Sequence, residues 1–97
     1  MKIYKIKKDQ ENKFLEWGEK LSNEFKEEAI QSLREENCTR EMFYLFKIGE
    51  DYFAAGHMEG SNIKPSTDTE LNREHKKILK ECLDDSITLS EVYNLKI

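Results

Sequence analysis

The chain has 97 residues, which include 20 acidic and 16 basic ones and give a net charge of −4 at pH 7. This length predicts one domain over residues 1–97, and the acidic balance argues against a nucleic-acid partner. No signal-type segment and no apolar run of about 18 residues occurs, so we expect a cytoplasmic protein with no membrane partner. Cys38 and Cys82 lie far apart and outside any metal-binding spacing, which predicts free thiols.

A short first strand is predicted over Lys2–Lys7, because apolar and basic residues alternate there. Tyr4 and Ile6 fall on one side of this strand, and Ile3 falls on the other. Asp9 follows closely and has a side chain suited to cap a helix. We therefore expect the strand to lead directly into a helix with Asp9 at its start.

A helical segment is predicted from about residue 10 to 36, where apolar residues recur at steps of four. Such a stripe drifts around the helix by about 40° per step, so one straight helix could not keep it against a sheet. Ser22 and Asn23 are cap-type residues that can reset the phase. The pattern therefore predicts two helices or one bent helix, and Asn37 suits a left-handed C-cap at the end.

The stretch from Thr39 to Gly60 predicts a long β-hairpin with a three-residue turn at Gly49, Glu50 and Asp51, in which glycine can take a positive φ. Side chains alternate along a strand, and here both faces are rich in apolar residues. The face expected beneath the helices is nearly free of charge: Met42, Tyr44, Phe46, Ile48, Tyr52, Ala54, Gly56 and Met58. The opposite face is mixed: Glu41, Phe43, Leu45, Lys47, Phe53, Ala55, His57 and Glu59.

The register of this hairpin depends on the turn. A three-residue turn places Phe43 opposite His57 and Glu41 opposite Glu59, which puts all four side chains on one face. A two-residue turn would slip the register by one residue and place Glu41 opposite Met58. We take the three-residue turn as the prediction.

A polar connection over residues 61–68 follows the hairpin, and Thr67 with Glu70 fits a capping box for a second helical region. The apolar stripe of that helix includes one histidine: Leu71, His75, Ile78, Leu79, Cys82 and Leu83. Residues 84–86 are expected to end the helix. Ile87–Ile97 then reads as a last strand, with apolar residues mostly on one side.

The predicted order β-α-β-β-α-β is that of an α+β, ferredoxin-like domain, in which helices cover one face of a four-stranded antiparallel sheet. The first strand of the hairpin lies at an edge of such a sheet. A long edge strand with apolar residues on both faces would aggregate unless it were covered. We therefore expect a homodimer, in which a second copy covers the face that the helices leave open.

Glu41, His57 and Glu59 are the first candidates for chemistry, since the predicted register directs them into one cavity. A carboxylate in a partly apolar pocket and an imidazole can act as acid and base. Alternatively, these groups lie at a solvated rim or pair with Arg40 or a lysine. A metal held by His57 and Glu59 would need a further ligand that the sequence does not supply. His75, on the apolar stripe, reads either as a buried, hydrogen-bonded core residue or as part of a site.

Residues spaced along nearly the whole chain support a resemblance: Glu16-Trp17, Leu33-Arg34-Glu35-Glu36, Glu41-x-Phe43 and Glu74-His75-Lys76. They resemble a family of small bacterial proteins classed as a domain of unknown function. That family is similar in architecture to the dimeric α+β barrel superfamily, which includes sugar mutarotases and small monooxygenases. The resemblance implies a dimer whose sheets face each other around a central cavity. It also directs attention to Trp17, Glu41, Phe43 and His75.

Three functions remain open. The first is a homodimer that binds a small organic ligand. The second is a cofactor-independent enzyme of mutarotase or monooxygenase type, and the third is a structural or regulatory dimer with a filled interior. The candidate residues comprise a catalytic and a substrate-contacting group: Glu41, His57 and His75 in the first, and Trp17, Phe43 and Glu59 in the second. No metal or other cofactor is predicted. We favour a cavity over a filled interior, because charged side chains on a face that a second copy would bury are costly unless they have a function or an interaction partner.

Overall fold

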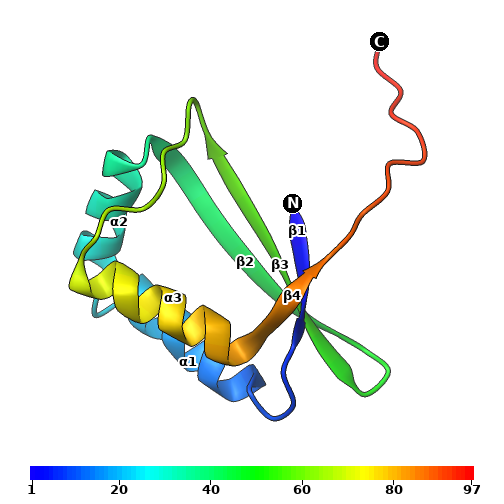
Figure 1. Cartoon of the computed structure of the whole chain (residues 1–97), viewed down its shortest axis with the longest axis horizontal. Coiled ribbons are helices and arrows are strands. Elements are labelled where there is room, and N and C mark those ends of the chain that lie inside the picture. The colour runs from blue at the N-terminus through cyan, green and yellow to red at the C-terminus, as the bar shows by residue number, and fades with distance from the viewer.

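A computed structural model describes residues 1–97 and shows seven elements: β1 (Lys2–Ile6), α1 (Glu11–Ser22), α2 (Lys26–Glu35), β2 (Cys38–Ile48), β3 (Asp51–Gly60), α3 (Glu70–Cys82) and β4 (Leu83–Ile87). The strands form one antiparallel sheet in the order β2-β3-β1-β4, so β2 and β4 are its edges. The three helices lie together on one side of the sheet (Figure 1). This confirms the predicted α+β class and four-stranded antiparallel sheet. None of the helices is long and apolar enough to cross a bilayer.

The predicted change of helix phase occurs at Ser22 and Asn23, where α1 ends before α2 begins. Both side chains bond to the last turn of α1: Ser22 Oγ donates to the Gly18 carbonyl at 2.8 Å, and Asn23 Nδ2 donates to the Glu19 carbonyl at 2.9 Å. Side chains that compete for backbone groups in this way favour helix ends. The drifting apolar stripe is therefore divided between two helices.

The caps follow the predictions only in part. Asn37 takes a left-handed φ of 58° directly after α2, as expected of a residue that ends a helix. The prediction for Asp9 was wrong, because α1 begins after Gln10 and no side-chain hydrogen bond caps it. Asp9 instead takes a positive φ of 63° in the turn between β1 and α1.

The end of the chain departs most from the predicted elements. Thr69, not Thr67, caps α3, and its Oγ1 accepts a hydrogen bond from the Asn72 backbone N–H at 3.1 Å. The helix ends at Cys82, and β4 follows at once, so residues 84–86 lie within a strand. The predicted strand Ile87–Ile97 was wrong, since residues 88–97 have no regular secondary structure.

The hairpin has the register of the two-residue turn. Ile48 pairs with Asp51 and Glu41 pairs with Met58, so Gly49 and Glu50 alone form the loop. Gly49 takes a φ of 62° at the first loop position, where two-residue turns of the II′ type require glycine. The predicted pairing of Glu41 with Glu59 was therefore wrong.

This one-residue slip changes which residues share a face. Phe43 and Leu45 of β2 lie beneath the helices instead of on the opposite face. Tyr52 and Ala54 of β3 lie there as predicted, and Ala54 is completely buried. The ring of Phe43 packs edge-to-face against Phe14 of α1, with centroids 5.6 Å apart. The face that the helices leave open carries the following residues of β2 and β3: Met42, Tyr44, Phe46, Ile48, Asp51, Phe53, Ala55, His57 and Glu59.

A small core joins the sheet to α1 and α3. Its buried members come from five elements: Ile6, Phe14, Trp17, Ala54, Ile78, Cys82 and Leu83. Both cysteines are free and buried, and burial raises the pKa of the Cys82 thiol, which leaves it protonated and unreactive. At the surface, Lys13 of α1 forms an ion pair with Glu81 of α3. Mutual hydrogen bonding raises the pKa of Lys13 and lowers that of Glu81.

Candidate functional site

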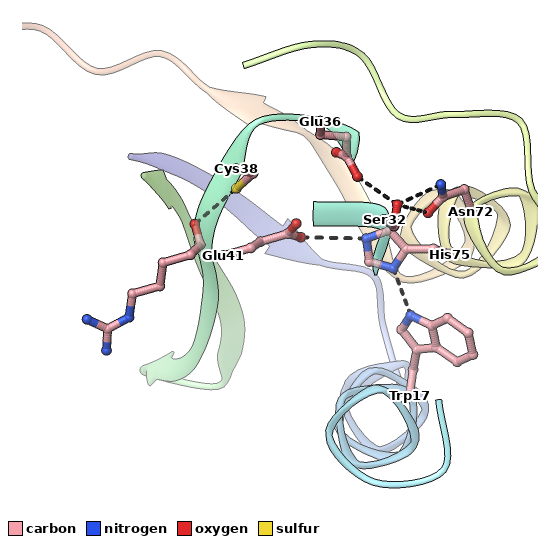
Figure 2. A network of polar contacts seen from close by, with 8 residues as sticks. Trp17, Ser32, Glu36, Cys38, Glu41, Asn72 and His75 are labelled. Atoms are coloured by element: carbon pink, nitrogen blue, oxygen red, sulfur yellow. Dashed lines mark hydrogen bonds and ion pairs between the residues drawn. The ribbon is translucent and has the colours of Figure 1, made fainter. Parts of the chain in front are cut away.

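Trp17, His75 and Glu41 meet between the helices and the sheet, although they come from α1, α3 and β2 (Figure 2). The indole Nε1–H of Trp17 donates to Nδ1 of His75 at 2.9 Å. The other imidazole nitrogen, Nε2, lies 3.7 Å from Oε1 of Glu41. The imidazole thus stands between an indole donor and a carboxylate.

Burial differs along this row of side chains. Trp17 is 5% exposed and belongs to the core, and its ring plane lies at 27° to that of His75, with centroids 6.1 Å apart. The side chains of His75 and Glu41 remain 23% and 27% exposed. The indole is therefore a fixed support, whereas the imidazole and the carboxylate can still meet water or a small solute.

The hydrogen bond from Trp17 sets the tautomer of His75. An indole N–H can only donate, so Nδ1 must offer its lone pair. A neutral imidazole then carries its proton on Nε2, the nitrogen that faces Glu41. At 3.7 Å the two groups are too far apart for a direct hydrogen bond, but a small shift or one bridging water would join them. This arrangement can move a proton between the carboxylate and a bound group.

The predicted cluster of Glu41 with His57 and Glu59 was wrong, because the observed register places Glu41 on the helix-covered face. His57 and Glu59 lie on the open face, where Nε2 and Oε1 are 3.5 Å apart. Phe43 lies two residues after Glu41 in β2 and on the same face, but its ring packs into the core against Phe14. The structure thus divides the six candidate residues between the two sides of the sheet.

A second polar network, which was not predicted from the sequence, lies beside His75 on α3 (Figure 2). Asn72 Nδ2 donates to Ser32 Oγ at 2.8 Å, and Ser32 Oγ donates to Glu36 Oε2 at 2.7 Å. All three residues are less than 9% exposed, so this carboxylate is buried with a hydroxyl as its hydrogen-bond donor. The network joins α2 to α3 and so fixes the helix that carries His75. In the sequence, only the spacing of Ser32 and Glu36, four residues apart on one helix face, could have indicated this network.

No three His, Cys, Asp or Glu side chains are grouped in a way that could hold a metal ion. A shallow groove of about 390 Å³ runs between α2 and the start of α3, away from His75 and Glu41. Half of the residues that line it are glutamates: Glu27, Glu28, Glu35 and Glu70. The candidate site is the accessible edge of His75 and Glu41, where a partly exposed imidazole faces a partly exposed carboxylate.

These features define a small α+β protein with an antiparallel sheet that is covered on one face and with a Trp–His–Glu contact beneath the helices. The sequence model of a family of unknown function, DUF6176, matches residues 1–96, and the chain belongs to that family. The expected membership in a family of unknown function is thereby confirmed. Neither a curated protein nor a solved structure matched the chain.

Proposed function

We propose that the chain is a ferredoxin-like domain that forms a homodimer, as in a dimeric α+β barrel, and binds a small organic ligand between the two sheets. The open face of the sheet carries this proposal. On that face the rings of Phe46 and Phe53 stack with centroids 5.6 Å apart, and Tyr44 and Ile48 are more than half exposed. A contiguous apolar surface of this kind marks an interaction site.

The strand order supports the same proposal. Both helical connections, α1 with α2 and α3 alone, lie on one side of a sheet with the strand order β2-β3-β1-β4, so a second sheet can pack on the other side. A sheet packed face to face lies about 10 Å away, a distance that interdigitating side chains normally fill.

The centre of the open face carries a small side chain, that of Ala55. Ala55 pairs with Tyr44 on one side and with Ile3 on the other, while Phe53 and His57 flank it along β3. A small side chain among larger ones fills less of the space between two packed sheets, and in a symmetric dimer two such positions would face each other and accommodate a ligand. His57, with Glu59 beside it, would supply the polar contacts that orient an organic ligand.

Sedimentation equilibrium and native mass spectrometry test this proposal. We expect the protein to be a dimer at micromolar concentration and to retain a small organic molecule when purified from its own cells. Phe46→Glu, which places a charge on the open face, should convert the dimer to a monomer and release that molecule. The adjacent substitution Lys47→Glu, on the other face, should leave both unchanged. A monomeric wild-type protein, or a dimeric Phe46→Glu variant, would contradict the proposal.

A second function, cofactor-independent acid–base catalysis, is favoured by the contact between Trp17, His75 and Glu41. The fixed tautomer directs the Nε2 proton toward the carboxylate, so the pair could donate and accept protons on one small substrate. This pair lies beneath the helices and is separate from the cavity proposed between the sheets. Interconversion of sugar anomers is a suitable test reaction, because it needs one acid and one base and no cofactor.

Polarimetry with freshly dissolved monosaccharides measures that reaction directly. If it is the activity, Glu41→Gln should lower the rate by about 10²–10⁴-fold while the far-UV circular dichroism spectrum stays unchanged. Glu50→Gln, the same substitution in the exposed hairpin loop, should leave the rate unaltered. Equal rates for the wild type and Glu41→Gln would remove Glu41 from the mechanism.

A further inference from the structure

The segment that follows β4 has large apolar side chains without a partner in its own chain. Residues 88–97 lead away from the sheet and the helices (Figure 1). Five large apolar side chains in this segment are each more than half exposed: Leu89, Val92, Tyr93, Leu95 and Ile97. The match to the family extends to residue 96, so the segment is part of the family's domain.

The last five residues of this segment alternate as in a strand with one apolar side. From Tyr93 to Ile97, apolar residues at odd positions alternate with Asn94 and Lys96. In β4, Ile87 pairs with Ile3, which lies on the open face of the sheet. An extended continuation of β4 would therefore direct its odd-numbered side chains toward the same side as the open face.

A receptor of matching length exists at the opposite edge of the sheet. The strand β2 has 11 residues, pairs only with β3, and leaves its other edge without a strand. Met42, Tyr44 and Phe46 project from it onto the open face. A ten-residue segment reaches about 33 Å when extended, which is close to the length of β2. A long edge strand of this kind is a template for strand addition.

From these observations we propose that residues 88–97 of one copy add as a strand to the β2 edge of a second copy. Tyr93, Leu95 and Ile97 then lie on the same side as the open face of that second copy. The exchange is reciprocal, so the dimer has a two-fold axis. The C-terminal segment of each copy then covers the β2 edge of the other. The occupant is a second copy because β4 and β2 lie at opposite edges of the sheet, and the segment leads away from its own β2. This inference rests on the proposed homodimer and adds how its subunits hold each other.

Two measurements test the exchange. The first is the dimer dissociation constant from sedimentation equilibrium. A chain ending after Ile87 and the variant Tyr93→Ser should each raise this constant at least about tenfold, whereas Asn94→Ser, on the polar side, should change it less than about twofold. The helical part of the far-UV circular dichroism signal should be the same for all three variants, because the segment is outside the core and contains no helix.

The second measurement identifies the chain that the segment contacts. A photoreactive benzoylphenylalanine replaces Tyr93 in the full chain, which is mixed with a size-tagged chain ending after Ile87. Illumination should produce a covalent product with the combined mass of the two chains, and peptide mapping should place the link in β2. Replacement of Asn94 by the same photoreactive residue should give much less of this product.

The outcomes separate the two proposals. A wild-type dimer whose dissociation constant is unchanged by the truncation, or a link formed only within one chain, would overturn the exchange and leave the homodimer standing. A wild-type protein that is monomeric at micromolar concentration would overturn the homodimer, and the exchange with it.

Discussion

Replacement of Trp17 by alanine is expected to lower the free energy of unfolding by about 3–5 kcal/mol. The indole is 5% exposed, and its ring lies between Phe25, at a centroid distance of 6.0 Å, and His75. Its loss would leave a cavity in a core that has only seven buried members. It would also remove the hydrogen-bond donor to Nδ1 of His75. Such a loss is a large part of the stability of a domain of this size, about 5–15 kcal/mol.

Two further substitutions separate packing from hydrogen bonding. Trp17→Phe keeps most of the ring packing and removes the N–H group, so it should cost about 1–2 kcal/mol. Leu15→Ala, on the same helix at a side chain 52% exposed, should cost no more than about 0.5 kcal/mol. Because Trp17 is the only tryptophan, urea unfolding should be followed by far-UV circular dichroism rather than by fluorescence. Equal costs for Trp17→Ala and Leu15→Ala would show that the indole does not belong to the core.

The parts of the fold that follow from local periodicity could be predicted from the sequence. The break between α1 and α2 required only the drift of the apolar stripe and the cap-type residues Ser22 and Asn23. The two sides of β1 follow from strict alternation: Ile6 is buried in the core, and Ile3 lies on the other side. These features depend on residues a few positions apart, so one segment contains all the information.

The hairpin register could not be decided in this way. A two-residue and a three-residue turn both have Gly49 available, and both faces of the hairpin are apolar, so neither register exposes an obviously wrong set of side chains. The slip of one residue nevertheless moves Glu41 from the side of His57 to the side of His75. The predicted grouping of Glu41 with His57 and Glu59 was therefore wrong, whereas Glu41 and His75, both candidates from the sequence, lie close together.

The strand β4 was missed for a different reason. Its sequence, LDDSI, has two acidic residues, whereas the residues after it alternate better. Tertiary packing overrides the local pattern, because Leu83 must follow α3 directly to fill the core beside Ile6, with which it pairs. Likewise, the contact of Trp17 with His75 joins residues 58 positions apart and depends on how α1 packs on α3.

A second large effect is expected at Gly60, where β3 ends opposite Cys38. A Cβ atom placed there would overlap the backbone carbonyl oxygen of Asn37 and would lie 3.1 Å from the Cα of Cys38. These are backbone atoms, which cannot rotate away as a side chain can. Gly60→Ala must therefore separate the ends of β2 and β3, and we expect it to lower the free energy of unfolding by about 1–3 kcal/mol.

The same substitution at Gly18 should have the opposite sign. Gly18 lies in α1, where a Cβ atom would meet nothing within 4 Å. Alanine is favoured over glycine in a helix interior by about 1 kcal/mol, so Gly18→Ala should raise the free energy of unfolding by that amount. The midpoints of urea unfolding of the two variants should thus fall on opposite sides of the wild type. If Gly60→Ala were as stable as the wild type, the close approach of β3 to the Asn37 carbonyl would be incorrect. The left-handed turn at Asn37, which sets the start of β2 and so the position of Glu41, would then be in question as well.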